Sequence, residues 1–167
     1  SDSSVILWLA PTTTIVEQTL KALKNDNHFY RQSLNEALDQ VYVWDIEDVL
    51  KTGNLVNQTG THIIVSTIQA FRTKNKKGRR VFSENSHYKN SITNPVSGLI
   101  CYPDTEIPIP CLANYLKQAM PVVIVDEAHN VKADLSMETL VDFNPSCILE
   151  FTATPETRQS KNPSNIL

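Results

Sequence analysis

The sequence predicts an α/β fold, in which a mostly parallel sheet is flanked by helices on both faces. Short apolar runs rich in β-branched residues alternate along the chain with amphipathic segments. The runs are apolar at successive positions, which is typical of strands that are covered on both sides. A length of 167 residues, with 41% hydrophobic and 20% charged residues, is that of a globular domain large enough to bury its own core.

The first seventy residues contain three predicted strands and two predicted helices. Val5–Leu9 is an apolar run that Ala10-Pro11 closes, and the threonines that follow supply a helix cap. The helix from Thr12 or Thr13 to about Leu23 carries its apolar residues at helical spacing. The later elements of this half are a helix near His28–Leu38, strands at Val41–Trp44 and His62–Val65, and a helical turn at Ile68–Phe71.

Residues 73–110 break this pattern. Five cations fall within seven positions, and many Asn, Ser and Pro residues follow: Lys74, Lys76, Lys77, Arg79 and Arg80. We predict a polar, basic insertion at about 73–110, whose cluster at Lys74–Arg80 is either a contact to the DNA backbone or a solvated charged loop. After it we expect a helix around Cys111–Gln118, a strand at Val122–Val125, a helix at Leu135–Val141 and a strand at Cys147–Phe151.

Composition limits the classes of partner. The net charge of -3 and a pI near 5.8 argue against binding of nucleic acid by bulk electrostatics alone, but leave room for a local contact surface. The three cysteines form no CxxC pair, and no histidine stands at ligand-like spacing from them, which indicates a reduced, cytoplasmic protein without structural zinc. No apolar run approaches the roughly 20 residues that cross a bilayer, so no membrane contact is expected.

The most informative residues follow the strand at Val122–Val125, where Asp126 and Glu127 stand side by side. Neighbouring carboxylates raise each other's pKa unless a cation or a proton intervenes. A magnesium ion held through one carboxylate and substrate phosphates resolves this conflict. The order then suggests Asp126 as the ion ligand and Glu127 as the group that activates a water. The alternative is a helix N-terminus whose acids favour the helix dipole.

Three other strand ends carry hydroxyl and amide side chains. Each segment alone would be an ordinary turn or helix cap. The segments are Ala10-Pro11-Thr12-Thr13, Ser66-Thr67-Ile68-Gln69 and Thr152-Ala153-Thr154-Pro155. Because the carboxyl ends of parallel strands meet at one edge of a sheet, their joint occurrence with Asp126-Glu127 predicts one site at that edge.

These four segments, in this order, resemble the first RecA-like motor domain of superfamily two helicases and translocases. Val123–His129 resembles motif two, the DEAH form of the Walker B sequence, and Thr152–Thr154 resembles motif three. Ala10–Thr13 is similar to motif Ia, and Ser66–Gln69 is similar to the next nucleic-acid motif, with isoleucine where proline is usual. The resemblance extends from Val5 to Pro155.

Within that superfamily the chain looks most like the restriction subunit of type III restriction enzymes. The segments that carry this narrower likeness are Leu9-Ala10-Pro11-Thr12, Glu17–Leu23 with the following Asn27–Arg31, and Phe151–Glu156. The likeness implies a motor that uses ATP to move along duplex DNA. It also implies a second RecA-like domain, an endonuclease activity elsewhere in the parent protein, and a modification methyltransferase subunit as a partner.

The resemblance also assigns roles to individual residues. Asp126 would hold the Mg²⁺ of Mg·ATP, Glu127 would position the attacking water, and His129 would couple the nucleotide to motif three. Around Ala153, the hydroxyls of Thr152 and Thr154 would relay the state of the γ-phosphate. The residues that would face the nucleic-acid backbone are Pro11, Thr12, Thr13, Thr67 and Gln69.

No GxxxxGK[ST] phosphate loop occurs in the sequence. In the family this loop precedes motif Ia, so we expect the chain to be an N-terminally truncated part of the domain, inactive by itself. The lost strand is expected near the sheet centre, where an exposed gap would promote dimerisation or strand exchange. Two other functions fit the same motifs. One is a RecA-like module that binds nucleic acid or a partner without nucleotide chemistry, and the other is an RNA helicase domain.

Overall fold

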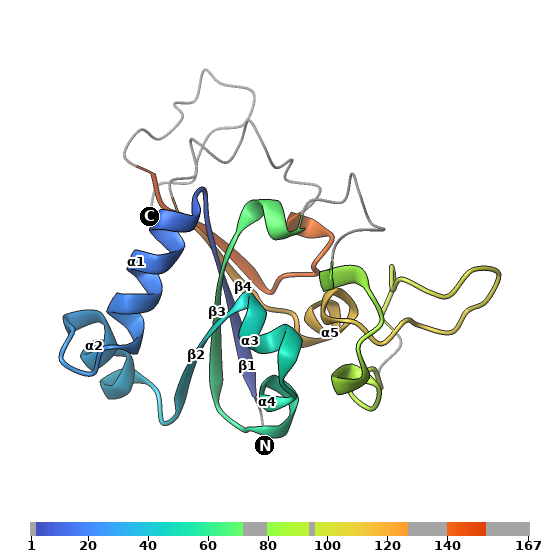
Figure 1. The fold of residues 1–167 in the computed structure, drawn as a ribbon, viewed down its shortest axis with the longest axis horizontal. Helices are drawn as coiled ribbons and strands as arrows, with labels where there is room; N and C mark the ends of the chain where they lie inside the picture. Colours follow the sequence, from blue (N-terminus) through green and yellow to red (C-terminus); the bar gives the residue numbers. More distant parts are fainter. Residues whose placement is uncertain (1–2, 72–79, 94–95, 127–139, 153–167) are drawn as a thin grey trace.

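Five parallel strands form one sheet in the order β2-β3-β1-β4-β5 (Figure 1). The structure is a computed structural model of the chain, and it describes residues 3–71, 80–93, 96–126 and 140–152. The strands are β1 (Ser4–Ala10), β2 (Val41–Asp45), β3 (Thr61–Thr67), β4 (Val122–Val125) and β5 (Cys147–Glu150). The predicted α/β fold with a parallel sheet is thus confirmed. No helix in the described ranges is long and apolar enough to span a membrane.

The α-helices are α1 (Thr13–Lys24), α2 (Phe29–Ala37), α3 (Ile46–Lys51), α4 (Asn54–Asn57) and α5 (Leu112–Ala119), and short 3₁₀ helices are η1 (Ile68–Phe71), η3 (Arg80–Phe82) and η4 (Ser86–Tyr88). Each predicted strand, and the predicted α1, α2, α5 and η1, agree with these bounds to within one or two residues. Of the helix predicted over 135–141, only the last two residues lie in the described part, and both are helical.

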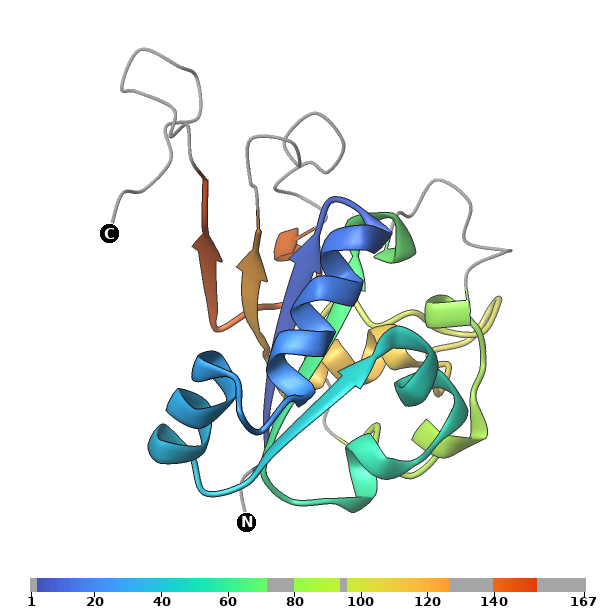
Figure 2. The same ribbon diagram turned by 60° about the vertical axis from the view of Figure 1, so that its left-hand side comes forward.

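Helices cover both faces of the sheet, as Figures 1 and 2 show. On one face α1 and α2 pack over a small core that includes Val16, Ile63 and Val65. On the other face α3, α4 and α5 pack over a larger core that includes Leu7 and Val123. Alternate residues of the central strands therefore enter different cores, which is why these strands are apolar at every position.

β1 lies at the centre of the described sheet. It pairs with β3 from Ser4 to Ala10 and with β4 from Ile6 to Leu9. The described strands are thus hydrogen-bonded without interruption from β2 to β5. β5 has one described neighbour, β4, and forms the edge.

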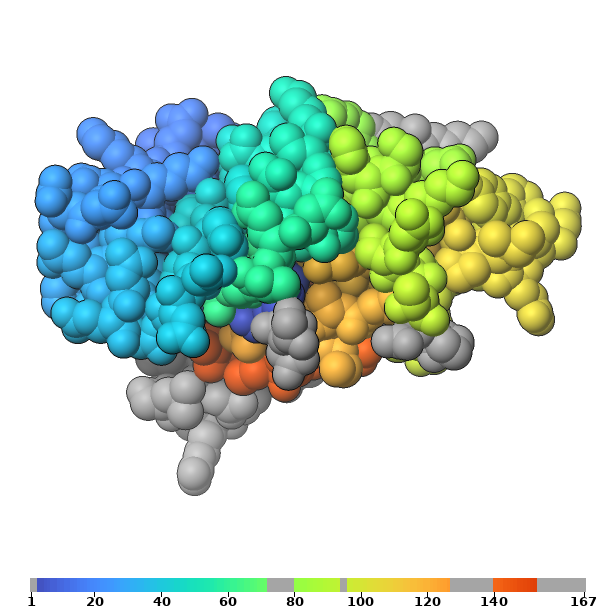
Figure 3. Space-filling model, turned by 90° about the horizontal axis from the view of Figure 1, so that it is seen from below, coloured from blue at the N-terminus to red at the C-terminus, as the bar shows by residue number. Residues whose placement is uncertain are grey.

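The described part of the predicted insertion is built into the larger core. Val81, Phe82 and Tyr88 are buried there, and residues 80–93 lie beside α3 and α4 in the space-filling view, with the yellow segment that follows on their far side (Figure 3). The Tyr88 hydroxyl donates to the carbonyl of Val49 (2.6 Å), and the Asn85 side chain donates to the carbonyl of Leu50 (2.9 Å). Polar side chains of this segment therefore satisfy backbone groups of α3.

Residues 99–110 form a projecting hairpin. The N–H of Tyr102 donates to the carbonyl of Ile107 (3.0 Å), and that of Ile109 donates to the carbonyl of Ile100 (2.8 Å). Its base rests on Asn114 of α5, which is fully buried. The Asn114 side chain accepts from the N–H of Ile100 and donates to the carbonyls of Ile100 and Ile109, each at 2.8 Å.

Candidate functional site

The register of the sheet places the ends of four strands side by side. Leu9 of β1 lies opposite Ser66 of β3 and Val125 of β4, and Val125 lies opposite Glu150 of β5. The segments that follow these strands therefore start at the same edge of the sheet. This is where the sequence predicted that its hydroxyl-, amide- and carboxylate-bearing segments would meet.

Asp126 is fixed at this edge by the backbone. Its N–H donates to the carbonyl of Leu9 (2.9 Å), and the N–H of Phe151 donates to the carbonyl of Val125 (2.9 Å). These bonds extend the pairing of β1, β4 and β5 by one residue. The Asp126 side chain is half-buried, and among the described residues nothing donates to it or pairs with it. A half-buried carboxylate at a strand end can accept a cation or a hydrogen-bond donor.

The described residues offer few ligands for a metal ion at this edge. No group of three His, Cys, Asp or Glu side chains in the described ranges could hold an ion, and all three cysteines are free thiols. Mg²⁺ commonly keeps several waters and binds through one or two carboxylates and substrate phosphates. A site with Asp126 as its described protein ligand fits that ion.

Part of the predicted site falls outside the described residues. Glu127 and His129 follow Asp126 there, and Ala153 and Thr154 do so after Thr152. Thr152 itself is half-buried and stands two residues beyond β5. The structure thus places Asp126 and Thr152 on neighbouring strands of one edge.

The first turn of α1 begins at the end of β1, and Pro11, Thr12 and Thr13 form this junction. Thr12 caps the helix, because its Oγ1 accepts a hydrogen bond from the N–H of Ile15 (3.3 Å). The capping role of Thr12 leaves its hydroxyl proton free to donate. Thr12 and Thr13 are exposed, and the first turn holds no acidic residue. The first amides and the positive end of the helix dipole thus favour an anion here.

Thr67 and Gln69 belong to the next strand end along the sheet. Thr67 closes β3 and Gln69 lies in η1, and both side chains are half-buried. Ile68, which stands where the resembled motif has proline, is 1% exposed and anchors η1 in the larger core. An apolar residue at this position thus fixes the turn by packing.

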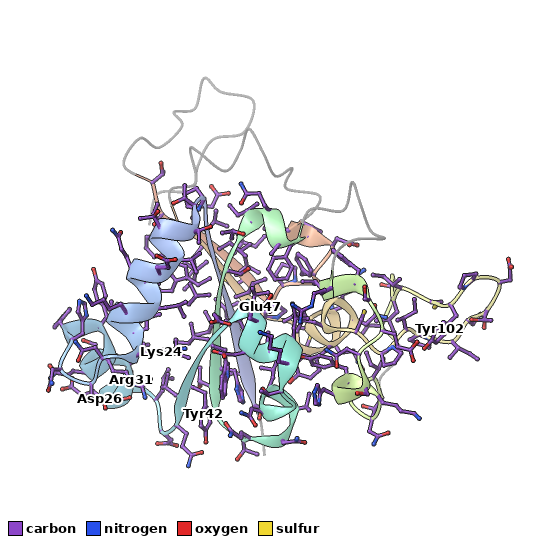
Figure 4. The ribbon with its side chains drawn as sticks, viewed as in Figure 1. Lys24, Asp26, Arg31, Tyr42, Glu47 and Tyr102 are labelled. Atoms are coloured by element: carbon purple, nitrogen blue, oxygen red, sulfur yellow. The ribbon has the colours of Figure 1, made fainter. Side chains whose placement is uncertain are left out.

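Of the basic cluster at 74–80, only Arg80 lies in the described part of the chain. Its guanidinium donates to the carboxylate of Glu47 on α3 (2.7 Å), and Lys51 pairs with the same carboxylate at 3.3 Å. The hydrogen bonds from Arg80 and then Lys51 lower the pKa of Glu47. Figure 4 labels Glu47 on α3, and this contact gives Arg80 a structural partner.

Other features of the described surface lie away from this edge. An open hollow lined by residues 37–40 and 59–61 lies where β2 and β3 begin, which is the opposite end of the sheet. Tyr102 in the hairpin at residues 99–110 projects to the side of the sheet (Figure 4). Sequence reasoning did not single out Phe71 and Phe143, whose rings meet in the core beneath η1. Single aromatic residues between polar ones gave no periodic signal for that contact.

Comparison with known proteins identifies the family. The family described as "Type III restriction enzyme, res subunit" matches residues 1–157 of the 167. No curated protein is significantly similar to the chain. The match includes every described strand and helix, and it agrees with the likeness found in the motifs. The chain belongs to the family of type III restriction enzyme res subunits, which are helicase-like motors that use ATP.

Proposed function

We propose that this chain is part of a DNA-translocating ATPase motor of a type III restriction enzyme, with its nucleotide and DNA contacts at the carboxyl edge of the sheet. The observation that supports this most strongly is the register of β3, β1, β4 and β5. It brings Thr67, Pro11, Asp126 and Thr152 to one edge, although they are spread over most of the sequence. Ligands of open parallel sheets bind at that edge.

On the nucleotide side, Asp126 holds Mg²⁺ and Glu127 orients the water that attacks the γ-phosphate. Bound Mg²⁺ supplies charge neutralisation on the phosphate oxygens. Asp126 suits this role because its backbone is fixed by the sheet and its carboxylate has no described partner. The chain carries no GxxxxGK[ST] loop to cradle the phosphates. We therefore expect this chain by itself to bind ATP weakly and to hydrolyse it negligibly.

On the DNA side, Pro11, Thr12 and Thr13 contact one part of the phosphate backbone, and Thr67 and Gln69 contact another. Hydroxyl, amide and backbone N–H donors position a protein on phosphates without reading sequence. Such contacts suit a motor that moves over any sequence. They also fit a chain with a net charge of -3, which has no excess of cations. His129, Thr152 and Thr154 couple this surface to the nucleotide.

The test is ATP hydrolysis by the full-length protein that contains this chain, measured with duplex DNA, with RNA and with neither. We expect duplex DNA to stimulate hydrolysis and Glu127→Gln to abolish it. Glu36→Gln is the matched control, because Glu36 is exposed on α2, far along the chain from the site residues. Stimulation by RNA alone would assign an RNA helicase. The absence of hydrolysis under all conditions would assign a binding module without nucleotide chemistry.

A further inference from the structure

We propose that Phe143 is a positioning residue that couples DNA binding to ATP hydrolysis through its contact with Phe71. The inference rests on the proposed function and concerns the regulation of the same site. The two rings meet edge to face, with centroids 5.1 Å apart and planes at 86°. Phe71 is 0% exposed and Phe143 1% exposed, so the contact is fully enclosed by the larger core.

Phe71 is joined directly to the proposed DNA surface. It ends η1, the short helix that follows Thr67 and contains Gln69. Ile68 and Phe71 hold η1 in the core from below, while Gln69 remains partly exposed. Because η1 is a single turn of four residues, a shift of Gln69 on binding a phosphate moves Phe71 with it.

Phe143 lies in a segment that is held firmly from the other side. Lys117 of α5, whose side chain is 4% exposed, donates to the Asp142 carboxylate (3.2 Å). The side chain of Asn144 donates to the carbonyl of Lys117 (3.3 Å), and the N–H of Ser146 donates to the carbonyl of Pro121 (3.0 Å). Residues 140–146 are thus tied to α5 and to the start of β4.

The position of residues 140–146 in the chain connects the Phe71–Phe143 contact to the proposed nucleotide site. Residues 140–146 lie between Asp126 and Thr152, and they lead straight into β5. A displacement of Phe143 therefore acts on a segment that continues into β5 and is hydrogen-bonded to Pro121, just before β4. Close-packed interiors transmit such displacements because they cannot absorb them in voids. The Phe71–Phe143 contact thus links the DNA side of the edge to its nucleotide side.

The test compares variants of the full-length protein by the ratio of ATPase rates with and without saturating duplex DNA. We expect Phe143→Leu to lower this ratio about 2- to 12-fold, the range that corresponds to an edge-to-face aromatic pair, with the basal rate within about twofold of wild type. Phe71→Leu should do the same. The double variant should be little worse than either single one, because both remove one interaction.

Phe82→Leu is the matched control. Phe82 is buried in the same core, at 7% exposure, but it lies in η3 rather than in the segments that flank the site. The inference is overturned if Phe82→Leu lowers the ratio as much as Phe143→Leu, or if Phe143→Leu leaves the ratio unchanged. A wild-type protein without DNA-stimulated hydrolysis would instead refute the proposed function, and the inference with it.

A second measurement needs no variant. Hydrogen exchange of the wild-type protein, with and without duplex DNA, reports on both sides of the contact. We expect DNA to slow exchange in peptides that cover residues 61–71 and also in peptides that cover residues 140–150. Slower exchange at 61–71 with no change at 140–150 would overturn the inference while leaving DNA binding by the chain intact.

Discussion

Substitution of Asn114 by alanine tests whether the segment before α5 is a built part of the domain. Asn114 is fully buried and makes three hydrogen bonds of 2.8 Å to the two sides of the hairpin at residues 99–110. Each such bond contributes about 0.5–1.5 kcal/mol to the free energy of unfolding. The gain in helix propensity from alanine offsets roughly 0.5 kcal/mol. We therefore expect Asn114→Ala to destabilise this region by about 1–4 kcal/mol.

The assay is hydrogen exchange of the full-length protein, followed in peptides that cover residues 98–110. Since 1.4 kcal/mol corresponds to a factor of ten, the amides of this hairpin should exchange roughly 5- to 700-fold faster in the variant. Asn35→Ala is the control, because Asn35 is exposed on α2, and exposed substitutions usually change stability by less than about 0.5 kcal/mol. A change of less than threefold in the hairpin would refute the structural role of Asn114.

Two further predictions concern pH and helix capping. Burial lowers the pKa of His62, whose Nδ1 accepts from Trp44 (3.0 Å) and whose Nε2 donates to Gln58 (2.9 Å). His62 therefore binds a proton more tightly in the unfolded state than in the folded state. As a result, the free energy of unfolding is highest above about pH 6.5 and falls as the pH drops below that value. The urea concentration at the midpoint of unfolding should fall with decreasing pH in the wild type, and it should fall less in His62→Leu. Thr12→Ala removes the cap on α1 and should cost about 1 kcal/mol and weaken DNA binding, whereas Thr12→Ser should keep both.

Much of the fold could be predicted because its strands carry a strong local signal. Runs such as Val5–Leu9 and Val122–Val125 are apolar on both faces, and α1 has a regular apolar stripe. The order of the strands could not be predicted, because neighbours in a sheet are chosen by tertiary packing. β1, for example, lies between β3 and β4 although β2 and β3 follow it directly in the sequence.

The short helices α3 and α4 had no periodicity to detect, at six and four residues. A local signal for α3 did exist. Asp45 and Asp48 form a capping box, with hydrogen bonds of 2.7 and 3.2 Å between side chains and backbone. The buried residues of 80–93, such as Tyr88, stand singly among polar ones, and only their partners on α3 explain them.

At the candidate site, too, the sequence predicted which segments gather but not the contacts that fix them. Residue types and the rule for strand ends predicted which segments would gather, because carboxyl ends of parallel strands share an edge. The hydrogen bond from the Asp126 N–H to the Leu9 carbonyl depends on the register of the strands. The position of η1 depends on how Phe71 packs in the core. These contacts were therefore beyond prediction from the sequence.

Binding of Mg·ATP at the edge where β1, β4 and β5 end underlies the proposed function. It is tested most directly by affinity cleavage, in which Fe²⁺ replaces Mg²⁺ in the full-length protein with bound nucleotide and cuts the backbone near the ion. We expect nucleotide-dependent cuts around Asp126, with weaker cuts near Pro11 and Thr152, and the loss of these cuts in Asp126→Asn. Cuts that do not depend on nucleotide, or that cluster near Gly60 at the opposite end of the sheet, would contradict it.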